Sequence, residues 1–396
     1  MTDIVIRGGR TLVEQELVEA SVAISGKTIS AVQSPAARAG VEIDAKGLLA
    51  LPGIVDLHGD AFERQMMPRP GVGFPIDVAL VDSDRQAIAN GITTVFHATT
   101  WSWEPGLRGA DNARKLIDAI EAQRPHLAAD TRFHLRQETY NIDAEETIIE
   151  WLKAGRIDLL AFNDHMSSIA ADMARPQKRA QMAERAGLNA DEFNELVKRI
   201  VTRKDEVPGS IARLAAAGVA SGTPMLSHDD SSPEMRRAFR AMGVTIAEFP
   251  INVPTAQEAA QAGEYIVFGA PNVVRGGSHT GWTKAADMIA QGLCSVLASD
   301  YYYPAQLLAA FRLAADHVLP LGRAWSLISE KPARAAGMTD RGRIADGARA
   351  DILLVDPAEA LRPRIVAVIA AGRIVHLTDI ERVQRTGTVS QSIAAA

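Results

Sequence analysis

The sequence predicts an α/β protein, a (β/α)8 TIM barrel with a small β-sandwich domain built from both chain termini. Short β-branched runs broken by glycine occupy both ends of the chain, and the middle alternates strand-like apolar runs with helical stretches. Eight such runs in under about 300 residues favour a closed parallel barrel. A doubly wound sheet is the main alternative, but no GxGxxG motif opens a helix after a strand.

The terminal runs are typical of strands joined by tight turns, because glycines separate them. They lie at residues 3–7, 20–25, 28–32, 350–356 and 364–376. We therefore expect a β-sandwich domain over residues 1–52 and 345–385, and a barrel over residues 53–344 between its two parts. Residues 386–396 are polar and then alanine-rich, so we expect a disordered tail there.

Helical patterns such as that of residues 110–123 separate most of the expected barrel strands. These strands lie at residues 54–58, 92–98, 132–138, 159–165, 224–230, 245–250, 265–270 and 295–300. The segment 166–222 is too long for an ordinary crossover and is rich in helix formers, so we expect an extra helical lid. Its cations Arg175, Lys178 and Arg179 are expected to be solvated.

Composition excludes several classes of function. The 396 residues carry a net charge of -6, which gives no basic field for nucleic acid, although a local cluster of cations could still bind a polyanion. The single cysteine, Cys294, rules out an intrachain disulfide. Neither a signal peptide nor an apolar run of the roughly 20 residues needed to span a bilayer is evident. We expect a cytoplasmic enzyme with a small-molecule substrate and no membrane partner.

The decapeptide LPGIVDLHGD at residues 51–60 carries the strongest chemical signal. In a strand, residues i and i+2 project to the same side, so His58 and Asp60 would leave the strand end together. An imidazole nitrogen beside a carboxylate oxygen suits a divalent cation. Other expected strands also end in metal-type residues, and the carboxyl ends of barrel strands meet at one face. These residues are Glu138, Asp164, His165, His228, Asp229, Asp230 and Asp300.

Each of these residues alone has a structural interpretation, since a histidine can be a hydrogen-bonded core residue and an aspartate can cap the next helix. Capping, however, predicts Ser, Asn and Thr as readily as His. We therefore predict two divalent ions, with Zn²⁺ as the first candidate and Mn²⁺, Fe²⁺ or Ni²⁺ as alternatives. The predicted ligands are His58, Asp60, Glu138, His165, His228 and Asp300.

Three strand residues receive more specific expectations. Glu138 is the candidate for a bridge between the ions, because no lysine lies at a strand end to be carbamylated. His134 shares its side of the strand with Glu138, so we expect it deeper in the barrel. His97 ends the second strand and is expected to support the ligands or the core.

A second feature is the segment GAPNVVRGGSHTG at residues 269–281, after the seventh strand. Two adjacent glycines let a backbone approach an anion closely, and a phosphate site after strands seven and eight is common in barrels. The alternative is a glycine turn with a solvated arginine. The candidate anion-binding residues here are Arg275, Gly276, Gly277, Ser278 and His279. Arg69 and Arg136 are further candidates, and Asp229 is a candidate to orient sugar hydroxyls or a histidine.

Taken together, these motifs resemble the amidohydrolase superfamily, and most closely its branch of diphosphatases from the carbon–phosphorus lyase pathway. The superfamily features are LPGIVDLH after a terminal β-domain and an aspartate on the eighth strand. Most members carry His-x-His where this chain has His-x-Asp, and many use a carbamylated lysine; both departures match that branch. Its matching segments are PRP at 68–70, GITTV at 91–95, HLRQE at 134–138, DH at 164–165, SHDD at 227–230, AEFP at 247–250, GAPNVVRGGSH at 269–279 and SDYY at 299–302.

The resemblance implies hydrolysis of α-D-ribose 1-methylphosphonate 5-triphosphate to the 5-phosphate and diphosphate, in phosphonate breakdown. It carries the metal ligands onto the same six residues and the phosphate contacts onto residues 275–279. Asp300 is then expected to take the proton from the attacking water. The superfamily often forms dimers, so a homodimer is among the expectations. The alternative function is hydrolysis of a C–N bond by a deaminase or cyclic amidase, which would not need the anion-binding loop.

Overall fold

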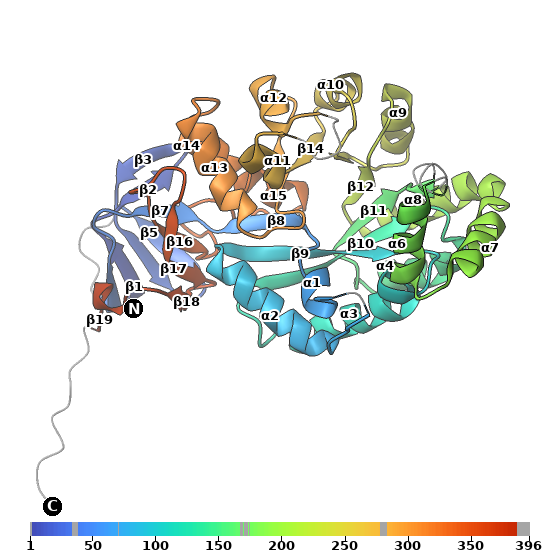
Figure 1. Cartoon of the computed structure of the whole chain (residues 1–396). Helices are drawn as coiled ribbons and strands as arrows, with labels where there is room; N and C mark the ends of the chain where they lie inside the picture. The colour runs from blue at the N-terminus through green and yellow to red at the C-terminus, as the bar shows by residue number, and fades with distance from the viewer. Residues whose placement is uncertain are drawn as a thin grey trace, which may run out of the picture.

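The structure of the protein, a computed structural model, describes residues 2–33, 39–69, 71–166, 169, 173, 175–277 and 283–385. Its largest sheet has eight strands, and every neighbouring pair is parallel (Figure 1). The strands are β8 (Ile54–Gly59), β9 (Ile92–Trp101), β10 (Asp130–Glu138), β11 (Leu159–Asn163), β12 (Met225–His228), β13 (Ile246–Glu248), β14 (Tyr265–Gly269) and β15 (Val296–Ala298). They follow one another in chain order, which confirms the predicted barrel.

The barrel closes where its first strand meets its last. Gly59 and Asp300 form a parallel bridge between the ends of β8 and β15. Beneath this bridge, the buried Asp56 accepts hydrogen bonds from the backbone amide of Ser299 at 2.9 Å and from its hydroxyl at 2.5 Å. Burial raises the pKa of Asp56, and the bonds from Ser299 oppose that rise. This contact holds the two strand ends together at the face where the candidate ligands lie.

Helices cover the barrel because their apolar faces pack on strands that are themselves buried, as all ten residues of β9 are. The helices around the barrel are α1 (Glu63–Met66), α2 (Ile76–Ala89), α3 (Ala110–Gln123), α4 (Glu145–Lys153), α8 (Val207–Ser221), α9 (Pro233–Ala241), α10 (Val253–Gln261), α11 (Ala270–Arg275), α12 (Ala285–Ala290), α13 (Ala305–Ala315), α14 (Leu321–Ser326) and α15 (Glu330–Ala335). Short 3-10 turns are η1 (Gly106–Arg108), η2 (Ile142–Ala144), η3 (Lys204–Glu206) and η4 (Ile380–Arg382). Among the described residues, no helix combines the length and apolar character that a membrane span requires.

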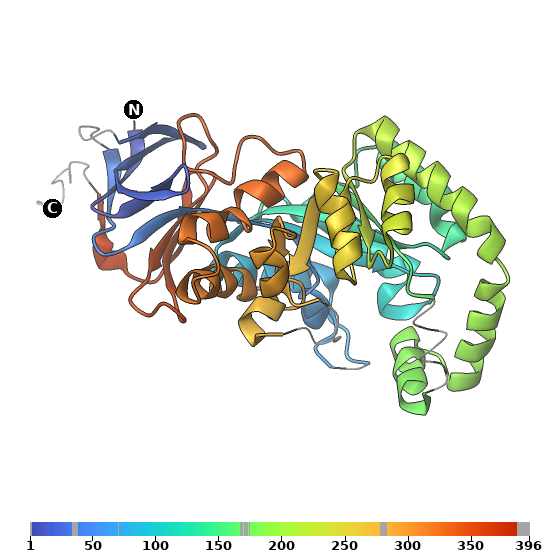
Figure 2. The ribbon, with the colours of Figure 1, turned by 90° about the horizontal axis from the view of Figure 1, so that it is seen from above.

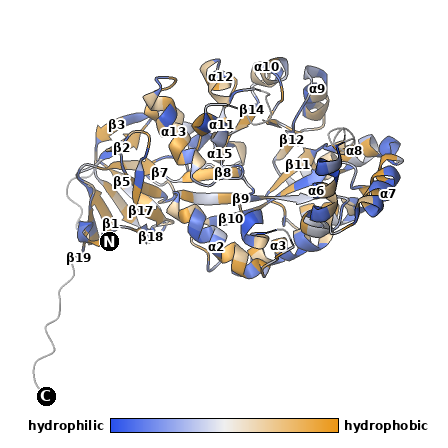
Figure 3. Cartoon of the chain, in the orientation of Figure 1, coloured by the Kyte–Doolittle hydropathy of each residue, from blue (hydrophilic) through white to orange (hydrophobic). Residues whose placement is uncertain are grey.

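The chain termini form two further sheets beside the barrel (Figure 1). Figure 3 shows hydrophobic residues along their strands, and isoleucines such as Ile6, Ile24 and Ile352 are fully buried there. One sheet has the order β19-β6-β1-β4-β5 and the other β18-β17-β16-β7-β2-β3. The strands are β1 (Thr2–Arg7), β2 (Arg10–Val13), β3 (Glu16–Glu19), β4 (Val22–Ser25), β5 (Thr28–Val32), β6 (Ala39–Asp44), β7 (Leu49–Pro52), β16 (Ile352–Asp356), β17 (Arg364–Ala370), β18 (Arg373–Leu377) and β19 (Val383–Arg385).

The terminal sheets contain more strands than the sequence predicts. The additional strands are β2, β3, β6, β7 and β19. The expected run 364–376 is a hairpin of β17 and β18, which turns at Ala371 and Gly372 with φ angles of 47° and 75°. The domain limits of 1–52 with 345–385, and of 53–344, stay a prediction. The expected disordered tail, 386–396, lies outside the described residues.

The long segment after β11 contains two helices beyond the barrel ring, α6 (Pro176–Ala186) and α7 (Ala190–Val201). We call this pair the lid. Figure 2 shows it in green at the end of the molecule away from the terminal sheets. Asn189 caps α7, since its side chain accepts from the amides of Asp191 and Glu192 and Glu192 bonds back to the Asn189 amide. The lid packs on η1, where a Cβ at Gly106 would lie 2.5 Å from the carbonyl oxygen of Arg185.

Gly53 marks the passage of the chain from β7 into the barrel, and space rather than a turn requires glycine there. A Cβ at Gly53 would lie 2.2 Å from Oγ1 and 2.9 Å from Cγ2 of Thr93, which is fully buried. It would also lie 2.9 Å from Cβ of Asp351, whose carbonyl accepts the Gly53 amide at 2.8 Å. Rotation of Thr93 cannot relieve this contact, because either branch of its side chain would collide.

Gly53→Ala is therefore expected to destabilise the protein by about 1–3 kcal/mol through overpacking. Urea denaturation followed by circular dichroism measures the change. Gly40→Ala is the matched control, since a Cβ there would meet only the Asp3 carbonyl oxygen at an ordinary 3.6 Å. Equal midpoints for both variants would contradict the close packing at this junction.

Candidate metal centre

Three imidazoles from different strands meet at the carboxyl end of the barrel. The ring of His228 lies 5.8 Å from that of His58 and 5.6 Å from that of His165, measured between centroids. His58 and His228 are buried, and His165 is 27% exposed at its side chain. Residues separated by 170 positions in the chain thus lie within one small volume, as parallel strands with a common direction require.

The first group of possible ligands comprises His58, Asp60 and Asp300, which each offer a ligand atom within 4.8 Å of the others. Backbone bonds hold them together, because the Asp300 amide donates to the His58 carbonyl at 2.9 Å and the Asp60 amide donates to the Asp300 carbonyl at 3.0 Å. Burial and the charge of Asp60 raise the pKa of Asp300 to about 6. A site with two carboxylates and an imidazole favours a cation that would offset their repulsion.

The backbone conformation of Asp300, and a glycine next to its carboxylate, also shape this group. Asp300 has a φ angle of 56°, in the left-handed region that is unfavourable for a residue with a Cβ. Asp229 and Phe249, which follow β12 and β13, have φ angles of 60° and 53°. Such strain at the ends of β12, β13 and β15, on one face of the barrel, is typical of functional sites. At Gly269, a Cβ would lie 3.2 Å from Oδ2 of Asp300, so glycine leaves space for that carboxylate.

The second group comprises His165, His228 and Asp229, again within 4.8 Å of one another. Oδ2 of Asp229 lies 3.1 Å from Nδ1 of His228 and 3.7 Å from Nε2 of His165. Burial would lower the pKa of His165, but the charge of Glu138 and the bond to Asp229 raise it to about 9. At His228, burial lowers the pKa of the ring and the charge of Asp229 raises it. The effect of burial is the larger, so the pKa of His228 is lowered.

Glu138, the predicted bridge, lies against His165. Its Oε1 accepts from Nδ1 of His165 at 2.6 Å, and its side chain is 6% exposed. Burial would raise the pKa of Glu138, but the His165 charge and hydrogen bond lower it. Within the described residues, Glu138 belongs to neither group of mutually close ligand atoms. Its role as a bridge stays a prediction.

Arg136 lies between the two groups. Its Nη1 is 3.5 Å from Oδ2 of Asp60, and its Nη2 donates to Nε2 of His228 at 3.4 Å. The residue is only 5% exposed, so this guanidinium is a buried positive charge among carboxylates. Arg136 therefore lies beside the possible ligands Asp60 and His228 and offsets part of the negative charge around them.

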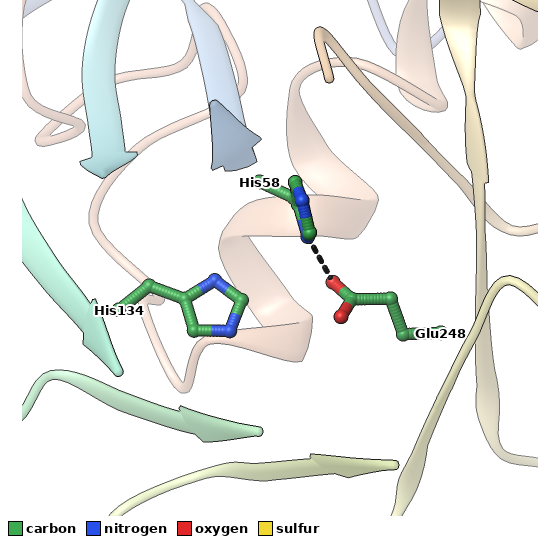
Figure 4. A group of neighbouring side chains, drawn as sticks. All are labelled: His58, His134 and Glu248. Carbon is green, nitrogen blue, oxygen red and sulfur yellow. Dashed lines mark hydrogen bonds and ion pairs between the residues drawn. The ribbon is translucent and has the colours of Figure 1, made fainter. Parts of the chain in front are cut away.

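A third group, His58, His134 and Glu248, lies among the strands (Figure 4). Nδ1 of His58 lies 2.9 Å from Oε1 of Glu248, and Nδ1 of His134 donates to the Leu57 carbonyl at 2.8 Å. All three side chains are fully buried. Burial would raise the pKa of Glu248, but the His58 charge and hydrogen bond lower it to about 2.

Two atoms of this third group have no hydrogen-bond partner among the described residues. They are Nε2 of His134 and Oε2 of Glu248, both buried. The His134 bond to Leu57 places its proton on Nδ1, and burial lowers the pKa of this ring to about 3, so Nε2 keeps a free lone pair. Buried unsatisfied polar atoms are rare in native proteins, and this donor set fits a divalent cation.

Sequence reasoning placed His134 below the other ligands but missed Glu248 altogether. The signal was present in AEFP, where a carboxylate ends the sixth barrel strand in the same manner as Glu138 ends the third. His97 is fully buried and packs its ring 4.9 Å from that of Phe62, and burial lowers its pKa to about 4. It is not among the three groups of possible ligands.

The predicted anion-binding loop is a helix end in its described part. Gly276 has a φ angle of 77°, and its amide and that of Gly277 donate to the carbonyls of Val273 and Asn272 in α11. These amides are therefore engaged by the helix. Arg275 is exposed and donates to the Tyr301 hydroxyl at 3.3 Å. Ser278 and His279 lie outside the described residues.

Two further candidates, Arg69 and Asp230, lie outside the three groups of possible ligands. Arg69 is exposed in a turn whose carbonyl accepts from the Val72 amide at 3.0 Å. Asp230 is fully buried, and its Oδ2 accepts from Ser227 at 2.5 Å and from Arg236 at 3.1 Å. Asp230 therefore stabilises the barrel, whereas its neighbour Asp229 faces the histidines.

Comparison with known proteins adds a family to this geometry. The model of the amidohydrolase family matches residues 49–394. The chain belongs to this family. Solved structures of low identity share the fold: a triazine hydrolase variant has a TM-score of 0.65 at 16% identity, covering 96% of this chain and 98% of that one. A β-aspartyl dipeptidase from Fervidobacterium islandicum AW-1 has a TM-score of 0.61 at 17% identity, covering 94% and 97%.

Curated relatives with different activities are similar to this chain in sequence. The alpha-D-ribose 1-methylphosphonate 5-triphosphate diphosphatase of Escherichia coli K12 is 31% identical, and the match covers 88% of this chain and 94% of the relative. An adenine deaminase of Methylobacterium nodulans is 28% identical over 94% of this chain, but only 58% of that relative is covered. Members of this amidohydrolase family are typically hydrolases that use divalent metals, and the three ligand groups fit that chemistry.

Glu248→Gln is expected to weaken divalent-metal binding by about tenfold or more, because the charged acceptor of the His58 Nδ1 proton is lost while side-chain volume is kept. Competition with a chromophoric chelator measures the affinity. Glu264→Gln is the control, since the Glu264 side chain is only 4% exposed but pairs with Arg240 at 2.8 Å and Arg236 at 3.2 Å instead of with a candidate ligand. An unchanged metal affinity in Glu248→Gln would remove Glu248 from the centre.

Proposed function

We propose that this amidohydrolase-family protein hydrolyses α-D-ribose 1-methylphosphonate 5-triphosphate to the 5-phosphate and diphosphate. The observation that carries the proposal is the similarity to the Escherichia coli diphosphatase over nearly the whole of both chains. The adenine deaminases match over a comparable part of this chain but extend well beyond it.

The proposed centre holds two divalent ions. His58, Asp60 and Asp300 would hold one, and His165 and His228, with Glu138 beside them, would hold the other. When bound, the ions lower the pKa of water and neutralise charge on phosphoryl oxygens. Zn²⁺, Mn²⁺, Fe²⁺ and Ni²⁺ all accept imidazole and carboxylate ligands, so metal analysis of the purified protein identifies the native ion.

The protein's own groups have defined tasks in this proposal. An oxygen of Asp300 accepts the proton of the attacking water, because this carboxylate lies with His58 and Asp60 at the position proposed for the first ion. Arg136, held between Asp60 and His228, stabilises negative charge that develops on the phosphoryl oxygens. Asp229 orients the rings of His165 and His228. Arg275, which is exposed at the end of α11, binds phosphate oxygens of the substrate.

Hydrolysis of a C–N bond is the second candidate, and the adenine deaminase relatives favour it. Purified protein loaded with metal separates the two candidates when it is assayed with the ribose triphosphate, with a nucleoside triphosphate and with adenine. Diphosphate release that stops on chelation and returns with added metal supports the proposal. Turnover of adenine alone would replace it with the deaminase.

Asp300→Asn is expected to lower kcat for diphosphate release by about 10²–10⁴-fold, because the amide cannot accept the proton. The side chain is not needed for packing, so the thermal midpoint should stay close to that of the wild-type protein. Steady-state kinetics and circular dichroism provide the two readings. Asp316→Asn, in an exposed carboxylate that pairs with Arg312, is the control. Full activity in Asp300→Asn would exclude the assigned role.

A further inference from the structure

A cavity of about 380 Å³ lies between the candidate centre and the lid. Glu138 and His165 form part of its wall, so it opens directly onto the proposed metal site. Arg108 from η1, with Lys178 and Arg185 from α6, also line it. Three cations thus share one small polar space with two candidate ligands, although the chain as a whole is acidic.

Carboxylates hold two of these cations in place. Nη2 of Arg185 lies 2.8 Å from Oε1 and 3.0 Å from Oε2 of Glu104, which is only 2% exposed. Nη2 of Arg108 donates to Oε2 of Glu63 at 3.2 Å. Both guanidinium groups are therefore oriented before any ligand binds, which lowers the entropy that binding would lose.

Lys178 differs from the two arginines. Its side chain is exposed, and it makes no hydrogen bond or ion pair with any residue that the structure describes. Glu104 and Glu63 balance the arginines, and Glu138 belongs to the candidate centre. The ammonium group of Lys178 is thus the uncompensated charge of the cavity, and it favours an anion with several oxygens.

We propose that Lys178, with Arg108 and Arg185, forms a subsite for a diphosphate group on the lid side of the centre. This inference rests on the proposed function and assigns the outer two phosphoryl groups of the triphosphate, and the diphosphate product, to this cavity. The lid then determines specificity, because it supplies Lys178 and Arg185 to a site whose other wall is the barrel. A substrate without a polyphosphate leaves these charges without a partner.

Calorimetric titration of the metal-loaded full-length protein with inorganic diphosphate tests the subsite directly. Lys178→Ala is expected to raise the dissociation constant by about tenfold, as for one lost charge-assisted contact, and Lys178→Glu to raise it further. Arg179→Ala is the matched control, because Arg179 is the next residue on the same helix and does not line the cavity. Its dissociation constant should stay within about twofold of the wild-type value.

The titration is paired with the triphosphate assay so that the two proposals fail separately. If Lys178→Ala binds diphosphate as tightly as Arg179→Ala, or if the wild-type protein does not bind it, the subsite is wrong whatever the enzyme hydrolyses. If diphosphate binding depends on Lys178 but the ribose triphosphate is not hydrolysed, the proposed function is wrong and the subsite remains. Under both proposals, Lys178→Ala raises KM for the triphosphate more than it lowers kcat.

Discussion

The closure of the barrel between β8 and β15 is the constraint on which the candidate centre depends. Asp56 on the first strand binds both the amide and the hydroxyl of Ser299 on the last, one residue before Asp300. That contact brings Asp300 to Asp60 and His58, which lie 240 and 242 positions earlier in the chain. Without it, Asp60 and Asp300, which lie on the first and last parts of the sheet, would not be held side by side.

Burying so many ionisable groups at one strand edge is unfavourable unless each has a partner. Each isolated buried charge costs about several kcal/mol, because it loses its hydration. The protein offsets this with pairs: Glu248 with His58, and Glu138 with His165. Asp229 lies between two imidazoles. Among the described residues, Nε2 of His134 and Oε2 of Glu248 are two buried atoms without a hydrogen-bond partner, which a cation or a water molecule could satisfy.

Much of this arrangement could be predicted from the sequence, for identifiable reasons. Strand ends in a parallel barrel share a face, so a histidine or aspartate at the end of an apolar run predicts a common site for residues as distant as His58 and His228. The His-x-Asp spacing also predicts that His58 and Asp60 project to the same side, since alternate residues of a strand do so. Both predictions follow from the alternation of side chains along a strand and from the order of strands in a barrel.

Other features depend on three-dimensional detail that periodicity cannot supply. Glu248 ends a three-residue strand, and AEFP places a carboxylate there but does not show that it is buried against His58. Gly276 and Gly277 were predicted to bind an anion through their amides, but these amides donate to carbonyls at the end of α11. Lys178 reads as a solvated lid residue, and only the packing of α6 against η1 brings it to a cavity beside His165. In each case the role of the residue depends on a contact in the folded structure that the sequence pattern does not show.

Anomalous X-ray diffraction from crystals grown with Mn²⁺ or Zn²⁺ tests the central claim most directly, because it locates the ions without any assumption about activity. The account predicts one anomalous peak within coordination distance of His58, Asp60 and Asp300, and a second beside His165 and His228. Ordered imidazoles and carboxylates with no anomalous density between them, or ions bound elsewhere on the protein, would contradict it.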